Sequence, residues 1–165
     1  MYDEIYADSV KGQLISVFSR VPLFMKDIDI EWWVTLYMKS KWRQMVEDGH
    51  PYYICKYGLE VAYALIPDRK TYKKGNKDLD IERDEYTLYW MAIVYNYLCH
   101  NYHIRCRRLI ELIPFRTLLN MFYPNHERSL KTFTDILYNE FLKDNIREID
   151  LIAKETLIEQ LSKKN

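Results

Sequence analysis

The strongest constraint on the fold is segment 86–98, YTLYWMAIVYNYL, whose apolar side chains surround a helix instead of forming one stripe along it. Two apolar faces can be drawn on this helix, one formed by Tyr86, Trp90, Ile93 and Tyr97 and the other by Leu88, Met91, Tyr95 and Cys99. A helix that is apolar on several faces belongs among other helices. Spanning a membrane takes about 20 apolar residues, so this segment is too short for that role. We expect it to be the central helix of a bundle, without membrane association.

The rest of the sequence predicts further helices around this one. Apolar residues recur at intervals of three and four positions before residue 50 and again between 106 and 161, and proline or glycine separates the runs. This spacing is typical of amphipathic helices. We therefore predict an all-α, single-domain bundle of about six to eight helices over residues 1–165, with a last amphipathic helix near 146–161.

Two segments depart from the helical pattern. The short apolar runs between 52 and 66 fit either two brief helices or one short strand pair, and periodicity does not decide between them. Segment 68–80, DRKTYKKGNKDLD, is polar and has almost nothing to bury, so it is predicted to be a surface loop. No linker is long enough to divide the chain into domains.

The net charge and the cysteines indicate which cellular compartment and which classes of partner are favoured. Basic and acidic residues number 24 each, giving a formal net charge of zero. A protein that binds polyanions generally carries a basic excess, so nucleic acid is less favoured as a partner, while a homo-oligomer meets no global repulsion. The three cysteines, Cys55, Cys99 and Cys106, form no disulfide framework, and the N-terminal segment lacks signal-peptide features. We expect a cytoplasmic protein.

The sequence contains no recognisable catalytic constellation. Its four glycines are isolated, and neither a nucleophile elbow nor an HExxH motif is present. Cys99, His103 and Cys106 would share one face of an uninterrupted helix and resemble zinc ligands, but a predicted helix end and turn separate them, and the paired short spacings of structural zinc sites are missing. We predict a non-catalytic protein with no metal and no cofactor.

The aromatic residues of segment 30–42 are the best candidates for contact with another protein. Trp32 and Trp33 are adjacent, so on a helix they point in different directions. One is expected in the core and the other on a groove or partner surface, where tryptophan is often a binding hot spot. The spacing leaves open which of the two faces outward.

A basic cluster follows the central helix. Its histidines and arginines include His103, Arg105, Arg107, Arg108 and Arg116, with Glu111 as the single acid nearby. The order helix, turn, helix is also the outline of a helix-turn-helix, which gives nucleic-acid binding through these five residues as the alternative function. However, the following LIELIPFRTLLNMF offers few polar side chains to read bases. A basic rim formed by Arg105, Arg107 and Arg108 and facing an acidic protein partner fits equally well.

Part of the chain resembles a family of small, uncharacterised bacterial proteins. The resemblance covers about Gly58 to Leu130, and the matching residues are Tyr89, Trp90, Tyr95, Tyr97, Pro114, Tyr123 and His126. Members of that family tend to be encoded beside toxin-like genes, including ADP-ribosyltransferase-like ones. The resemblance therefore implies an antitoxin, immunity or defence-system accessory protein that works through protein–protein contact.

Overall fold

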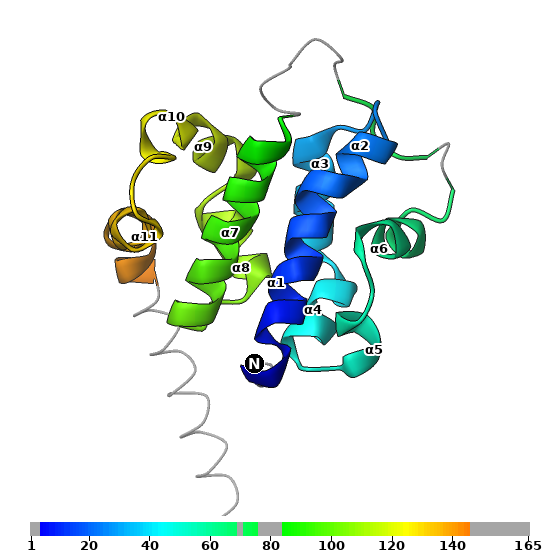
Figure 1. Ribbon diagram of the computed structural model, residues 1–165, viewed down its shortest axis with the longest axis horizontal. Coiled ribbons are helices and arrows are strands. Elements are labelled where there is room, and N and C mark those ends of the chain that lie inside the picture. The colour runs from blue at the N-terminus through cyan, green and yellow to red at the C-terminus, as the bar shows by residue number, and fades with distance from the viewer. Residues whose placement is uncertain (1–3, 69–70, 76–83, 146–165) are drawn as a thin grey trace, which may run out of the picture. The chain divides into compact units, whose positions relative to one another are not determined.

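The computed structural model describes residues 4–68, 71–75 and 84–145 (Figure 1). Over these residues the protein is all-α, as predicted, and the one β-type pairing among them is an isolated antiparallel bridge between Ile28 and Lys74. Contacts within the chain divide it into two compact units, 1–127 and 128–165. The described part of the chain contains no helix that is both long and apolar enough to cross a membrane.

The first unit is built from short helices. In chain order they are α1 (Ala7–Ile15), α2 (Val21–Phe24), α3 (Ile30–Lys39), α4 (Lys41–Glu47), α5 (Pro51–Ile54), α6 (Gly58–Leu65), α7 (Glu85–Tyr102), α8 (Cys106–Leu112), α9 (Phe115–Asn120) and α10 (Phe122–Asn125). The helical turns η1 (Glu4–Tyr6) and η2 (Ser16–Arg20) extend the first of these into one continuous run. The segments are shorter and more numerous than expected because one or two non-helical residues separate neighbouring helices, such as Ser40 between α3 and α4 and Ile113 with Pro114 between α8 and α9.

The region between 52 and 66 is helical, so the strand pair considered for it is wrong. Proline at the first position of α5 has a backbone angle suited to a helix start. The backbone N–H of Tyr57 donates to Glu60 Oε2 at 3.0 Å, which stabilises the start of α6. A Cβ atom on Gly58 would lie 2.5 Å from the carbonyl oxygen of Ser16, so only glycine lets α6 approach η2 this closely.

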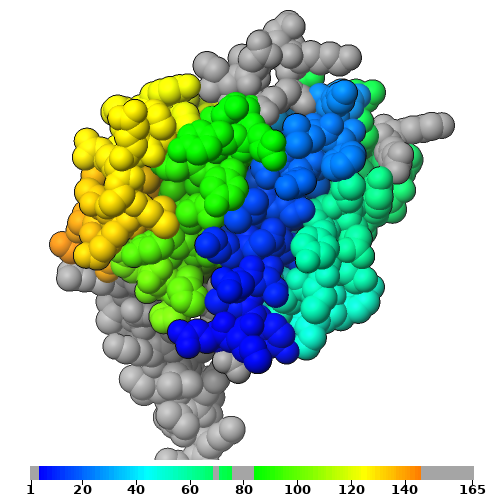
Figure 2. Space-filling view, in the orientation of Figure 1, coloured from blue at the N-terminus to red at the C-terminus, as the bar shows by residue number. Residues whose placement is uncertain are grey.

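Helix α7, which the sequence predicted to be central, packs in this unit against α1, the turn η2, α8 and α9. It runs beside α1 in the opposite direction, and Figure 2 shows α1 lying between α7 on one side and α5 and α6 on the other. The predicted face formed by Leu88, Met91, Tyr95 and Cys99 is buried. The other predicted face is partly open, because Tyr86 is 55% exposed. The hydroxyl of Tyr95 donates to the carbonyl oxygen of Ile113 at 2.7 Å, which fixes the end of α8 against α7.

The described part of the predicted polar loop is attached to the start of α3. The backbone N–H of Asp29 donates to the carbonyl oxygen of Lys73 at 2.9 Å, and that of Gly75 donates to Asp27 at 2.9 Å. Ion pairs reinforce this attachment, since Lys73 lies 2.8 Å from Asp29 and Lys74 lies 3.0 Å from Asp27. The segment 71–75 therefore forms one side of the surface beside α3.

The second unit contains α11 (Leu130–Leu137) and the π-helical turn η4 (Tyr138–Leu142). Ser129 caps α11 by accepting a hydrogen bond from the backbone N–H of Thr132 at 3.2 Å. The apolar residues Phe133, Leu137 and Leu142 are buried. The helix predicted near 146–161 lies outside the described residues.

Candidate functional site

The position of helix α3 shows which of the two adjacent tryptophans faces outward. Asp29 caps this helix by accepting the backbone N–H of Trp32 at 2.9 Å. The helix then buries Trp33, which is 0% exposed and whose Nε1 donates to the carbonyl oxygen of Val17 at 2.9 Å. Trp33 therefore cannot contact a partner in this structure. The neighbouring Trp32 points away from the core and is half-buried.

Trp32 lines a shallow groove along the outer side of α3. The groove has a volume of about 500 Å³ and is lined by Glu31, Trp32, Thr35, Leu36, Lys39, Ser40 and Lys73. Trp32 and Leu36 are one helical turn apart and supply its apolar part, whereas charged side chains occupy its borders. We call these seven residues the Trp32 groove. An apolar centre within a charged border is the usual composition of a protein-binding surface.

Two of the predicted arginines lie beside the Trp32 groove, in ion pairs with acids. Arg116 of α9 contacts Glu31 through Nη2 at 2.9 Å and through Nε at 3.2 Å. Arg108 of α8 lies 3.5 Å from Glu111, which also contacts Lys39 at 3.6 Å. The structure therefore joins Trp32 with Arg108 and Arg116 into one continuous surface formed by α3, α8 and α9.

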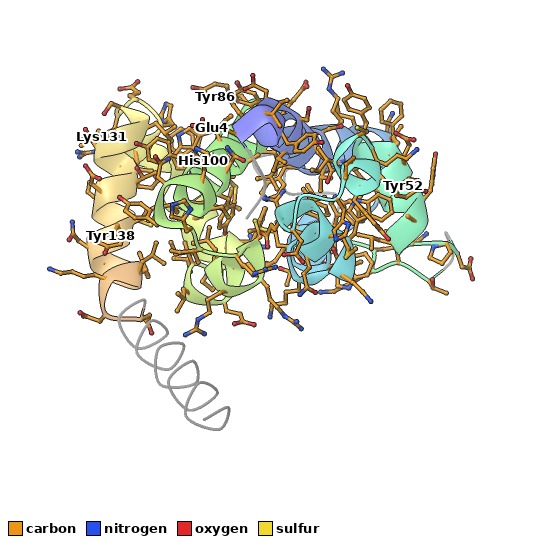
Figure 3. All side chains as sticks on the ribbon, turned by 90° about the horizontal axis from the view of Figure 1, so that it is seen from below. Glu4, Tyr52, Tyr86, His100, Lys131 and Tyr138 are labelled. Atoms are coloured by element: carbon orange, nitrogen blue, oxygen red, sulfur yellow. The ribbon has the colours of Figure 1, made fainter. Side chains whose placement is uncertain are left out.

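The other two arginines of the predicted rim lie on or next to α8. Arg105 contacts Asp48, at the end of α4, at 2.6 Å. Arg107 is exposed on α8. Exposed aromatic side chains also occur elsewhere, since Tyr52 of α5 and Tyr86 of α7, both labelled in Figure 3, are 66% and 55% exposed. A second groove, of about 390 Å³, is lined by the exposed Phe24 and Tyr57. The α3 surface differs from it in having a tryptophan and the predicted arginines Arg108 and Arg116 beside it.

The segment predicted as a helix-turn-helix does contain two helices and a tight turn. His103 ends α7 in the left-handed conformation, with φ of 53°, and is exposed. However, α8 has only seven residues, and three of them, Cys106, Leu109 and Ile110, are buried. Because Arg105, Arg108 and Arg116 contact acids, this surface carries little of the unpaired positive charge that phosphate binding requires.

A second chemically distinctive region lies in the core. Arg43 and Glu47 of α4 have side chains that are 1% and 4% exposed, and Arg43 Nε donates to Glu47 Oε1 at 3.2 Å. Arg43 Nη1 donates to the hydroxyl of Tyr37 at 3.4 Å, and that hydroxyl donates to Gln13 Oε1 at 2.8 Å. Burial raises the pKa of Tyr37 to about 12, so its hydroxyl remains protonated and able to donate.

Two buried thiols border this polar network. Cys99 Sγ and Cys106 Sγ are 3.1 Å apart, and the backbone N–H of Cys106 donates to Glu47 Oε1 at 2.8 Å. Burial raises the pKa of the Cys106 thiol well above its ordinary value. The structure therefore brings Cys99 and Cys106 together, as a shared helical face would have done, but it leaves His103 in solvent and places Glu47 beside the thiols instead.

Sequence reasoning missed Arg43 and Glu47 because their spacing carries no unusual signal. An acid four residues after a base is ordinary on a protein surface, and Lys56, just before α6, forms such a pair with Glu60 of α6, with side chains 32% and 51% exposed. The one available clue is Val46, which lies on the same helical face as Arg43 and Glu47 and is buried with them.

Comparisons with known proteins do not assign this chain to a family. No family model, no curated protein and no solved structure matches it.

Proposed function

We propose that this chain is a non-catalytic protein that binds a protein partner through the Trp32 groove. The observation that carries the proposal is the half-buried position of Trp32 in a groove beside a border of charged side chains. Large aromatic side chains with a polar surround that excludes water account for much of the binding energy at protein interfaces. A partner that inserts an apolar side chain beside Trp32 and Leu36 would gain binding free energy, because this contact removes water from both side chains.

The pairing of charges around the groove favours a protein over a nucleic acid. Glu31 contacts Arg116, and Glu111 contacts both Lys39 and Arg108, so the border alternates in sign instead of forming a basic stripe. Alternating charges fix the orientation of a protein partner and discriminate against wrong ones. Nucleic acid needs a row of cations that replace counterions along the phosphate backbone.

The partner class we propose is a toxin-like protein, which this chain would neutralise or accompany as an antitoxin, immunity or defence-system accessory protein in the cytoplasm. This part of the proposal rests on the family resemblance of segment 58–130. The absence of a recognisable catalytic constellation in the sequence agrees with a role by contact alone.

The test begins with photo-crosslinking in the native cell. A photoreactive phenylalanine analogue replaces Trp32 in one variant and the exposed Tyr52 in a control variant. We expect one protein to be captured in stoichiometric yield from position 32 only. Its dissociation constant for the purified chain should rise at least about tenfold with Trp32→Ala and remain unchanged with Tyr52→Ala. Equal capture at both positions, or equal affinity of both alanine variants, would contradict the proposal.

A second experiment examines the basic rim and the toxin. Charge reversal of Arg105, Arg107 and Arg108 should weaken binding of the same partner, mainly by slowing association. The partner expressed alone should inhibit growth, and co-expression of this chain, but not of its Trp32→Ala variant, should restore it. Binding to duplex DNA that weakens steeply with salt would instead support the nucleic-acid alternative.

A further inference from the structure

We propose that Glu47, Cys99 and Cys106 form a binding site for a thiophilic divalent cation of the zinc class. The carboxylate oxygen and the two sulfur atoms all lie within 4.8 Å of one another, and all three residues are buried. They come from different parts of the chain: Glu47 ends α4, Cys99 lies in the last turn of α7, and Cys106 begins α8. Thiolate and carboxylate are both ligands that zinc takes in proteins.

The distances are close to those that a bound cation needs. Zinc–sulfur bonds of about 2.3 Å at a tetrahedral angle place two sulfurs about 3.8 Å apart. The 3.1 Å between Cys99 Sγ and Cys106 Sγ therefore has to open by less than one ångström. Glu47 Oε1 already accepts hydrogen bonds from Arg43 and from the backbone of Cys106. Glu47 Oε2 forms an ion pair with Arg105 Nη1 at 3.9 Å, which is beyond hydrogen-bond distance, so this oxygen keeps lone pairs that could bind a cation.

The charge balance of the cluster also permits a buried dication. Without metal, the buried Arg43 and Glu47 cancel each other and the two thiols are neutral. When the cation binds, each thiol loses one proton, so two positive charges enter as two leave. The net charge of the cluster is zero before and after, and this avoids the large cost of burying an unbalanced charge.

Arg43 provides an independent sign that negative charge belongs in this cluster. Its Nη2 atom is buried and has no hydrogen-bond partner within the described part of the protein. A buried donor without a partner costs free energy, more so when it is charged. Metal-bound thiolates are acceptors, and outer-shell donors that orient them are a regular part of metal sites. Arg43 would serve as that donor.

The same two thiols are also close enough for a disulfide, but the surroundings favour the cation. A disulfide requires about 2.05 Å between the sulfur atoms and leaves the buried Nη2 of Arg43 without an anionic acceptor. A bound cation would be ligated by Glu47, Cys99 and Cys106, and Arg43 would donate a hydrogen bond to a thiolate. The cation would connect α4, α7 and α8 in the first unit, so this site is structural and independent of partner binding at Trp32.

The test uses the full chain, unfolded and refolded under reducing conditions with either Zn²⁺ or Co²⁺. We expect one equivalent of metal, a higher melting temperature with Zn²⁺ than with a chelator, and thiolate-to-cobalt charge-transfer bands in the Co²⁺ form. Metal affinity should fall as pH falls, because protons compete for the thiolates. X-ray absorption of the wild-type zinc form should show two sulfur neighbours and at least one oxygen, which requires no variant.

Matched variants identify the ligands. Cys99→Ala and Cys106→Ala should abolish the charge-transfer bands, and Glu47→Gln should weaken metal binding at least about tenfold. Cys55→Ala, at the exposed cysteine, and His103→Asn, at the exposed histidine, should leave binding unchanged. Failure of the reduced wild-type chain to retain one equivalent of either metal would overturn the proposal. So would retention in Cys99→Ala, or a native protein lighter by two hydrogen atoms, which is the mark of a disulfide.

Discussion

Two arginine–glutamate pairs with similar separations occupy opposite environments in this protein. Arg43 and Glu47 approach to 3.2 Å with side chains 1% and 4% exposed, whereas Arg116 and Glu31 approach to 2.9 Å with side chains 44% and 39% exposed. The buried pair belongs to the network that organises the core, and the exposed pair borders the Trp32 groove. We expect the two pairs to contribute very differently to stability, although their distances are similar. Solvent screens the exposed pair, and water can replace either of its partners.

The largest effect is expected at the buried pair. Glu47→Gln should lower the free energy of unfolding by about 3–5 kcal/mol, because Arg43 would remain as a buried charge without a counter-ion. Urea titration of the wild type and the variant in the presence of a chelator measures this change without a contribution from metal. The matched control is Glu31→Gln, for which a loss above about 1 kcal/mol would remove the distinction drawn here.

The next effect concerns the neutral part of the same network. Tyr37→Phe removes the hydroxyl that donates to Gln13 and accepts from Arg43, leaving polar atoms of both residues unpaired in the core. The expected loss is about 1–3 kcal/mol. The matched control is Tyr52→Phe, at a residue 66% exposed, which should unfold at the same urea concentration as the wild type. Equal midpoints for all three proteins would show that the buried hydroxyl contributes nothing.

Asp29 provides an intermediate case between the two pairs, because its carboxyl is only partly buried. Burial alone would raise the pKa of this carboxyl, but hydrogen bonds from Lys73 and from the backbone of Trp32 outweigh it and hold the pKa below 3.8. A depressed pKa stabilises the folded state above the unfolded value and loses that effect as pH falls through the folded value.

Asp29→Asn retains a residue that can cap α3 but removes the charge. The wild type should therefore be the more stable protein at pH 6, by no more than about 1 kcal/mol, and this advantage should shrink below pH of about 4. Chemical unfolding at several pH values measures it. An advantage that grew on acidification would contradict the sign assigned to this carboxyl.

The smallest effect is expected at the exposed pair. Arg116→Ala should change the free energy of unfolding by about 0–1 kcal/mol, and added salt should reduce even that. In contrast, the same substitution should weaken partner binding if the charged border of the Trp32 groove excludes water as proposed. Thermal unfolding and titration with the captured partner, performed on the same preparation, separate these two roles.

The contrast between the pairs also explains what the sequence could and could not predict. Spacing predicted two apolar faces on α7, and the face of Leu88, Met91, Tyr95 and Cys99 is buried, because apolar residues gain free energy where the fold covers them. The face that contains Tyr86 has the same spacing but stays partly open. Arg43 and Glu47 have the same spacing as the exposed Lys56 and Glu60, and only the packing of other helices around α4 distinguishes them.

The candidate site also contains features that residue spacing predicted and features that only the tertiary fold determines. That one of Trp32 and Trp33 faces the core follows from their adjacency, but which one does so depends on where α3 begins, and Asp29 sets that point. The spacing of seven residues between Cys99 and Cys106 predicted a shared face only on an uninterrupted helix, and the turn expected between them left their nearness unpredicted. Glu47 was not predicted either, because it arrives from a helix more than 50 positions earlier in the chain. Sequence-distant neighbours of this kind require the tertiary fold.

Ser40 joins these two regions, since it ends α3 and begins α4. Its hydroxyl donates to the carbonyl oxygen of Tyr37 at 2.6 Å and accepts the backbone N–H of Arg43 at 3.1 Å. Each residue of an α-helix turns the chain by about 100°. If Ser40 still caps α4, a residue inserted after it moves Arg43 and Glu47 one position further along α4 and turns their side chains by that angle around its axis. Arg43 and Glu47 would then leave the core while Trp32 kept its place. The position at which Ser40 starts α4 thus determines whether the charged side chains of Arg43 and Glu47 are buried or exposed to solvent.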